Sequence, residues 1–386
     1  MRRLEMPDPA QRLARLIEFD TQNPTGDELA ICEFLAGELR RLGADQVELR
    51  EVPRDLPGGA PGGSGVSPTN DGGAPGLPGA PPGRGAFVFA RFGRPRLLIN
   101  AHVDTVPANT GWTRDPHRAL ITEDRVVGLG SADTKGAIAA ALTALETATP
   151  RDVAVLFSGD EERGTTCLRA FLDSGLGTEI ERAIVCEPTA RTAGIRHRGV
   201  VALSARRLGR GGHSSRADDM PKPIVELAAL AVELDRIGAS YRTRGPERMT
   251  GICNNIAAID GGVAFNVVPD AATLTWSIRP YPGFDRAEYD AEVSRAIGSD
   301  IDLSVFVDHP PFASRDAAGF EALLGDRVRA MVTLDFWTEA ALLSEAGIPA
   351  VVLGPGDIAQ AHAADEFVDR SDLIWATELF CELVAQ

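Results

Sequence analysis

Four short apolar segments, each closed by polar or turn residues, constrain the fold of this chain more than any other feature. They lie at residues 97–100, 153–157, 183–186 and 350–353. A helical pattern over 137–145 separates the first two. Because buried strands that alternate with helices are typical of parallel sheets covered on both sides, we predict an α/β domain. Its sheet should be mixed but mostly parallel, with helices on both faces.

The pattern changes between residues 199 and 312. Strand-like and helical stretches follow one another here in the order strand 200–204, helix 224–237, strands 255–259 and 272–278, helix 286–297 and strand 303–307. This β-α-β-β-α-β order is typical of a ferredoxin-like α+β unit. Since 386 residues fit two domains, we predict one domain from 1–198 and 313–386, with residues 199–312 inserted into it.

Two features near the N-terminus predict local structure. Thr25 and Glu28 have the spacing of a capping box, and an apolar helical stripe follows until Gly43. Residues 53–85 are rich in Gly, Pro, Ser and Asn and almost lack large apolar side chains. Such a segment buries too little surface to offset the entropy of ordering it. We interpret it as a flexible surface insertion between two strands, with a lid over a substrate as the alternative.

Charge and composition exclude several classes of partner. The chain has 39 Lys+Arg against 55 Asp+Glu and a formal net charge of −16, whereas nucleic-acid binding needs a basic face. The five cysteines form no C-x-x-C pair, which indicates neither a disulfide framework nor a cysteine zinc site. No segment approaches the roughly 18 apolar residues of a membrane helix, and no apolar segment follows the basic N-terminus. We therefore predict a cytoplasmic protein without nucleic-acid or membrane partners.

Acidic and histidine residues follow each of the four predicted strands. They are His102 and Asp104, then Asp160, Glu161 and Glu162, then Glu187, and finally His362. Because the carboxyl ends of parallel strands meet at one edge of a sheet, these side chains should lie close together. A single His after a strand is more often structural, and paired Glu residues are usually solvated, so the prediction depends on the whole set.

Two histidines and three carboxylates can hold two zinc ions if one carboxylate bridges them. Such ions lower the pKa of a bound water to about 7. Asp104 can accept the second ring N–H of His102, and of the adjacent Glu161 and Glu162 one can bind metal while the other acts as general base. The Gly128-Leu-Gly130 segment does not complete a nucleotide-binding fingerprint, because Asp133 occupies its last position.

Six ordered motifs cover nearly the whole chain outside residues 53–85. They are His102-Val-Asp-Thr-Val-Pro107, Gly128-Leu-Gly-Ser-Ala-Asp-Thr-Lys-Gly136, Glu161-Glu162, Glu187-Pro-Thr189, Gly209-Arg-Gly-Gly-His-Ser-Ser215 and Gly354-Pro-Gly-Asp-Ile-Ala-Gln-Ala-His362. Together they resemble the family of acetylornithine deacetylase, succinyl-diaminopimelate desuccinylase and the zinc aminoacylases and carboxypeptidases.

The resemblance implies a ligand set for two Zn²⁺ ions, which Co²⁺ can replace. His102 and Glu187 would bind one ion, Glu162 and His362 the other, and Asp133 would bridge them. Glu161 would be the general base and then pass its proton to the leaving amine. The resemblance also implies a cis peptide bond after Asp133.

Three further residues gain roles from the resemblance. His213 would reach the active site of a partner subunit and stabilise the oxyanion there, which implies a homodimer formed through the inserted domain. A capping or turn residue in the Gly-rich loop is the alternative for His213. Asn266 and Arg279 match positions that bind the substrate carboxylate, and a planar guanidinium suits that task. For Arg279 a surface ion pair is the alternative.

The segment Asp335-Phe-Trp-Thr-Glu-Ala340 resembles the acetylornithine deacetylase branch, and particularly acetylcitrulline deacetylase. This implies zinc-dependent hydrolysis of a small N-α-acyl amino acid, N-acetyl-L-ornithine or N-acetyl-L-citrulline, to acetate and the free amino acid in arginine biosynthesis. Glu339 could attract the ornithine ammonium or be a structural acceptor. The alternatives are a dipeptidase or aminoacylase, or a hydrolase that frees lysine or ornithine from a carrier protein. A non-catalytic binding protein is disfavoured because all five ligand positions are filled.

Overall fold

The computed structural model describes residues 7–53 and 85–385, which form two compact units. Unit 1 comprises Met1–Ile195, Ser314–Thr333 and Thr338–Gln386, and unit 2 comprises Arg196–Ala313 and Leu334–Trp337. The predicted insertion at 53–85 lies, apart from its two end residues, outside the described residues.

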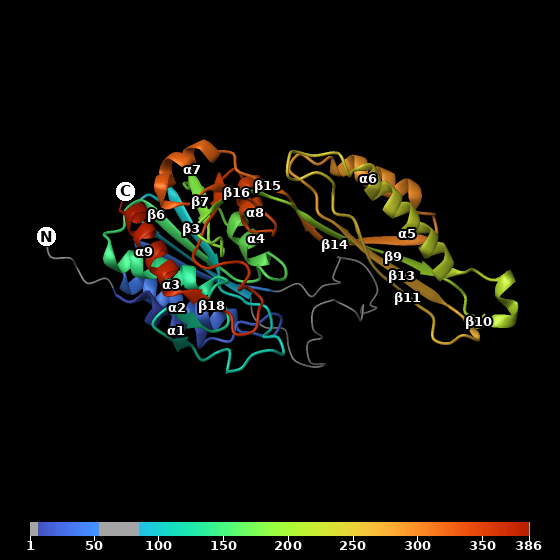
Figure 1. Ribbon diagram of the computed structural model, residues 1–386, viewed down its shortest axis with the longest axis horizontal. Coiled ribbons are helices and arrows are strands. Elements are labelled where there is room, and N and C mark those ends of the chain that lie inside the picture. Colours follow the sequence, from blue (N-terminus) through green and yellow to red (C-terminus); the bar gives the residue numbers. More distant parts are fainter. Residues whose placement is uncertain (1–6, 54–84, 386) are drawn as a thin grey trace. The chain divides into compact units, whose positions relative to one another are not determined.

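A nine-stranded mixed sheet forms the centre of unit 1, although its end strand, Phe312–Ala313, belongs to unit 2 (Figure 1). Its order is β1 (Gln46–Val52), β2 (Gly85–Phe92), β6 (Val153–Ser158), β3 (Leu97–His102), β7 (Arg182–Val185), β17 (Ala350–Val352), β8 (Ala193–His197) and β15 (Phe312–Ala313), and β16 (Met331–Leu334) pairs with β8. The neighbours β6, β3, β7 and β17 are parallel. They contain the four apolar segments of the sequence and are buried along nearly their whole length, as strands covered on both faces must be.

Helices cover both faces of this sheet, as predicted. They are α1 (Pro9–Ile17), α2 (Glu28–Arg41), α3 (Lys135–Thr147), α4 (Thr166–Asp173), α7 (Ala317–Leu324), α8 (Ala340–Glu345) and α9 (Arg370–Val384). Alternate side chains of β2 show the two faces: Val88 and Ala90 belong to a core shared with α1, α2, α3 and α9, whereas the rings of Phe87 and Phe89 pack against Phe171 of α4. The fold class read from the sequence is confirmed.

Helix α2 begins differently from the prediction. Its N-cap is Asp27, whose carboxylate accepts the Ala30 N–H. The Glu28 side chain is buried and accepts the backbone N–H groups of Ala86 and Asp160 instead. The predicted capping box is therefore wrong, because the neighbouring aspartate caps the helix and the glutamate serves a tertiary contact. Gly43 follows the helix end with a φ of +85°, as predicted for a helix terminator.

Unit 2 contains a four-stranded antiparallel sheet in the order β11 (Asn255–Gly261), β13 (Ala271–Ile278), β9 (Val200–Leu208) and β14 (Ile301–His309). Helices α5 (Pro223–Ser240) and α6 (Arg286–Ala296) share an apolar core with it, into which β13 contributes Leu274, Trp276 and Ile278. The chain order is the predicted β-α-β-β-α-β. Leu334–Trp337 also belongs to unit 2, where Trp337 stacks on His309 and donates to the Pro310 carbonyl.

Smaller elements complete the two units. In unit 1, β18 (Phe367–Asp369), β5 (Arg125–Val127) and β4 (Leu120–Ile121) form a three-stranded sheet that joins the C-terminal segment to the chain ahead of α3. In unit 2, β10 (Gly212–His213) pairs with β12 (Val267–Val268), and the 3₁₀ turn η1 (Ser214–Asp219) follows. Unit 1 also has the short 3₁₀ turn η2 (Gly325–Arg327). Among the described residues, none of the helices has the length and apolar character needed to span a membrane.

Candidate metal centre

The ends of the parallel strands bring the predicted acidic and histidine residues together. His102 is the last residue of β3, Glu161 and Glu162 lie in the turn after β6, and Glu187 comes shortly after β7. The loop after β17 carries His362. Because these four strands are parallel neighbours, their carboxyl ends share one edge of the sheet.

Four of these side chains, together with Asp133 in the loop before α3, form two groups that could each hold a metal ion. One group is His102, Asp133 and Glu187, and the other is Asp133, Glu162 and His362. Within each group the potential ligand atoms lie within 4.8 Å of one another. Asp133 belongs to both groups: its Oδ1 lies 3.0 Å from His102 Nε2, and its Oδ2 lies 3.5 Å from His362 Nε2.

The donor set fits two divalent cations. His102 Nδ1 lies 3.0 Å from the Asp104 carbonyl and 3.4 Å from its carboxylate, both acceptors, so Nδ1 carries a proton. In the neutral ring Nε2 then has a lone pair directed at the Asp133 carboxylate, and two acceptors at 3.0 Å need a cation or proton between them. Imidazole nitrogen and carboxylate oxygen are ligands that zinc accepts.

The electrostatics of the cluster also favour bound cations. Burial raises the pKa of Glu161 and of Glu187 well above the usual range, and nearby carboxylates raise both further. Taking several carboxylates out of water is costly unless opposite charge lies among them. Cations bound by the two groups would supply that charge.

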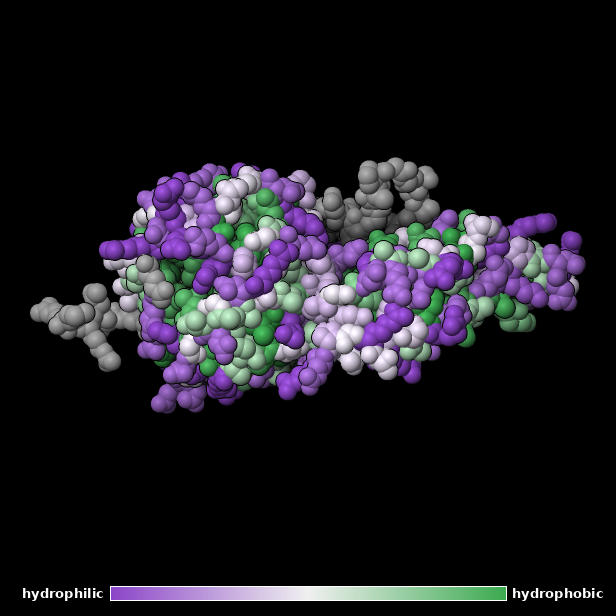
Figure 2. All heavy atoms as spheres, turned by 90° about the horizontal axis from the view of Figure 1, so that it is seen from above, coloured by the Kyte–Doolittle hydropathy of each residue, from purple (hydrophilic) through white to green (hydrophobic). Residues whose placement is uncertain are grey.

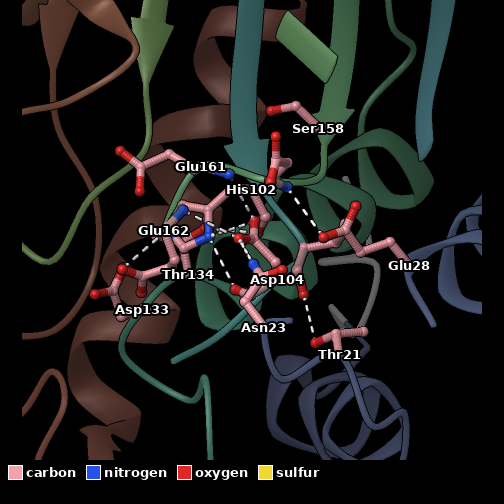
Figure 3. A network of polar contacts seen from close by, with 12 residues as sticks. Thr21, Asn23, Glu28, His102, Asp104, Asp133, Thr134, Ser158, Glu161 and Glu162 are labelled. Atoms are coloured by element: carbon pink, nitrogen blue, oxygen red, sulfur yellow. Dashed lines mark hydrogen bonds and ion pairs between the residues drawn. The ribbon is translucent and has the colours of Figure 1, made fainter. Parts of the chain in front are cut away.

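Asp104 links the His102 segment to the turn after β6 (Figure 3). Its carboxylate is fully buried and accepts the backbone N–H groups of Glu161 at 3.1 Å and Glu162 at 3.0 Å. Asn23 donates to the same carboxylate from its side-chain amide. Asp104 therefore contacts the His102 ring and also fixes the backbone of the two glutamates.

The backbone has unusual features at three of the loops around these residues. The Asp133–Thr134 peptide bond is cis, as the resemblance implied. His362 has a positive φ of 60°, a conformation that few non-glycine residues adopt and that often occurs at functional sites. At Gly354 a Cβ atom would lie 2.7 Å from the Glu187 carbonyl oxygen. Glycine is needed there because the loop after β17 passes close to the Glu187 backbone.

The three remaining predicted site residues lie in unit 2. His213 is exposed, and its Nδ1 accepts the Ser215 backbone N–H, so it caps η1 as the alternative interpretation expected. Asn266 is exposed beside it, and its carbonyl accepts the Ser214 N–H. Arg279 is exposed after β13 and forms no ion pair with the residues that the structure describes.

Three buried glutamates near the site have contacts that the sequence did not indicate. Glu28 accepts the Asp160 N–H, Glu339 accepts the Ser158 hydroxyl at 2.8 Å, and Glu366 accepts backbone N–H groups of the loop that carries Asp133. Burial raises the pKa of Glu339 and of Glu366 to about 7. In the sequence, one feature could have drawn attention to one of the three: Glu366 comes four residues after the predicted ligand His362.

Comparisons with known proteins show which family the chain belongs to. The sequence model that describes peptidase family M20/M25/M40 matches residues 98–386 of this chain. An N-acetyl-L-citrulline deacetylase of Xanthomonas campestris pv. campestris is 38% identical over 304 residues, covering 74% of this chain and 80% of that protein. An acetylornithine deacetylase of Myxococcus xanthus is 30% identical over 314 residues, covering 76% and 80%. The M20 family metallo-carboxypeptidase Sso-CP2 from Sulfolobus solfataricus has the same fold, with a TM-score of 0.74 at 17% identity over 98% of this chain and 100% of that one.

The fold and the site define a metallohydrolase with a candidate two-metal centre. The chain belongs to peptidase family M20/M25/M40. It is a metal-dependent amidohydrolase, similar in sequence to the two deacetylases, and the resemblance seen in its motifs is confirmed.

Proposed function

We propose that this enzyme hydrolyses the amide bond of an N-α-acetyl amino acid, with N-acetyl-L-citrulline as its main substrate, to acetate and the free amino acid. The observation that carries this proposal is the position of Asp133, whose two oxygens face two separate histidine–carboxylate groups. Two cations bridged in this way would bind the acyl oxygen and activate a water for attack on the carbonyl carbon.

The ligand set in this proposal is the one that the motifs implied. His102 and Glu187 would bind one Zn²⁺, and Glu162 and His362 would bind the other, with Asp133 as the shared ligand. Co²⁺ would suit the same ligands.

Glu161 is the general base in this proposal. Its neighbour Glu162 accepts a hydrogen bond from His362, at 2.9 Å between Nε2 and Oε1. The Glu161 carboxylate forms no hydrogen bond with the described residues, although its backbone is fixed by Asp104. Glu161 can therefore take a proton from the attacking water and donate it to the nitrogen of the leaving amine.

Two observations favour citrulline over ornithine as the amino-acid part. The acetylcitrulline deacetylase above is 38% identical and the acetylornithine deacetylase 30% identical. Glu339, the acidic residue that could have attracted the ornithine ammonium, is 1% exposed and binds Ser158. A neutral ureido group needs no such counter-charge. Either product would place the enzyme in arginine biosynthesis. The five cysteines are free, which fits a location in the reducing cytoplasm.

A direct comparison of substrates tests this proposal. We expect kcat/KM for N-acetyl-L-citrulline to exceed that for N-acetyl-L-ornithine by about tenfold or more, because Glu339, the acidic residue considered for the ornithine ammonium, is buried and bonded to Ser158. Acetate release by the zinc-loaded enzyme gives the rates, with N-acetyl-L-methionine and a dipeptide measured in parallel. Preference for acetylornithine would reverse the assignment. Preference for the other two would make the enzyme an aminoacylase or dipeptidase, and activity on an amino-acyl carrier protein would indicate the third alternative.

We also propose that the enzyme is a homodimer formed through unit 2. Exposed apolar side chains occur on helix α5 at Val225 and Val232 and on strand β14 at Leu303, Val305 and Phe306. Figure 2 shows hydrophobic residues among polar ones on the surface of this unit. Apolar side chains gathered on one helix and on an edge strand are typical of a subunit interface.

His213 has the protonation pattern of an oxyanion donor. Because Nδ1 accepts the Ser215 N–H, the neutral ring carries its proton on Nε2. We propose that this Nε2–H stabilises the oxyanion in the partner's active site, and that Asn266 and Arg279 bind the substrate carboxylate.

Mixed dimers test the role of His213. His213→Ala should lower kcat by about 10²-fold or more while the zinc content stays unchanged. Dimers reassembled from equal amounts of the His213→Ala and Glu161→Ala chains should regain about a quarter of wild-type activity, because one of the two sites in each mixed dimer is intact. Wild-type kcat in His213→Ala would refute the role, and no recovery in mixed dimers would refute action across subunits.

A further inference from the structure

Glu366 accepts several backbone hydrogen bonds from the loop that carries Asp133. Its side chain is 2% exposed. Oε1 accepts the backbone N–H groups of Ala132 at 2.8 Å and Asp133 at 3.1 Å, and Oε2 accepts that of Gly130 at 3.0 Å. The Glu366 carbonyl also accepts the Gly128 N–H at 2.9 Å. Four backbone donors of residues 128–133 thus end on this one residue.

The loop needs such an acceptor because it lies between two regular elements. Residues 128–133 leave strand β5 and precede helix α3, and all of them are buried. Buried N–H groups without a partner are costly, so nearly all of them are satisfied in folded proteins. A carboxylate accepts several N–H groups at once, and such charged hydrogen bonds are strong.

Glu366 also connects this loop to a metal ligand. It comes four residues after His362 and directly before β18, which pairs with β5. The contact of Glu366 with residues 128–133 therefore sets the position of Asp133 relative to His362. His102 instead ends the central strand β3 and Glu187 follows the central strand β7, and the pairing of these strands positions both residues without Glu366.

We propose that Glu366 is a positioning residue that holds Asp133 and His362 in register, so that the group Asp133, Glu162 and His362 can bind its ion tightly. This inference rests on the proposed two-metal function. The two ions should therefore respond differently to this residue. Loss of the Glu366 carboxylate weakens ion binding by the group Asp133, Glu162 and His362. The group His102, Asp133 and Glu187 can still bind its ion through its strand-end ligands.

The substitution Glu366→Gln tests this with little change in volume. Glutamine keeps one acceptor oxygen, but its NH₂ group would face a backbone N–H, since both are donors. Titration of the metal-free protein with Zn²⁺, followed by calorimetry, should give two tight sites for wild type. For Glu366→Gln we expect one site of wild-type affinity and a second weaker by about 10- to 100-fold. Excess Zn²⁺ should restore most of kcat at unchanged KM.

Glu339→Gln is the matched control. Glu339 is equally buried, and its pKa is also raised to about 7, but its carboxylate accepts a side-chain hydroxyl and no N–H group of residues 128–133. It should keep both zinc affinities. If Glu366→Gln does not fold, as judged by thermal unfolding, Glu366→Asp replaces it; that shorter carboxylate should weaken the second site to a smaller extent.

The outcomes separate this inference from the proposed function. Two unchanged zinc affinities in a folded Glu366 variant would overturn the positioning role and leave the two-metal function intact. Equal weakening in Glu339→Gln would also overturn it, because the effect would then come from lost buried charge. Fewer than two ions in the wild-type protein would overturn the proposed function itself.

Discussion

Glu161→Ala is expected to bind about two Zn²⁺ ions per chain and to lose turnover by about 10³-fold or more. The physical reason is that the Glu161 carboxylate lies outside both ligand groups and forms no hydrogen bond with the described residues. Removing it takes away the proton acceptor and leaves five ligands. Metal analysis of the purified variant, together with acetate release at saturating substrate, measures both quantities.

The neighbouring residue supplies the control for this prediction. Glu162→Ala removes a carboxylate of the same length from the same turn, but one that binds His362. It should lose metal as well as activity. If Glu161→Ala instead loses an ion and Glu162→Ala does not, the roles of the two glutamates are exchanged.

Asp133→Ala is expected to have the largest effect on metal content. Asp133 is the one residue shared by both groups among the described residues, so its loss removes a ligand from each ion and the bridge between them. We expect fewer than two ions per chain after gel filtration and no detectable turnover, even with added Zn²⁺.

Glu187→Ala is the control for Asp133→Ala, because Glu187 belongs to one group. It should retain one tightly bound ion. Equal metal loss in both variants would show that the two ions do not depend on a shared carboxylate, and the bridging assignment would be wrong.

The sequence was sufficient to predict the sheet and the meeting of the strand ends. Apolar segments such as residues 97–100 and 153–157 are a strong signal, because strands buried on both faces must be apolar throughout. Parallel neighbours then place His102 and Glu187 at one edge without further information. The motif resemblance added the pairing of the candidate ligands and the proposed role of Glu161.

The contacts that support the site could not be predicted in this way. Glu28 and Glu366 accept backbone N–H groups more than 100 residues away along the chain. Such contacts leave no periodic pattern, because they depend on which loops the finished fold brings together. The spacing of Thr25 and Glu28 even favoured a local bond, which the adjacent Asp27 makes instead. Similarly, nothing in the composition of Leu334–Trp337 indicated that it packs in unit 2.

The order in which the strands occur along the chain affects how the site is assembled during synthesis. Strand β17 lies between β7 and β8 in the sheet, although the ribosome makes both of them, and all of residues 199–312, beforehand. The candidate ligands His102, Asp133 and Glu187 therefore emerge first, whereas His362 and Glu366 emerge only after β17. A nascent chain that has emerged through Glu187 therefore holds one candidate ligand group, and the second can form only after the segment with His362 and Glu366 has left the ribosome.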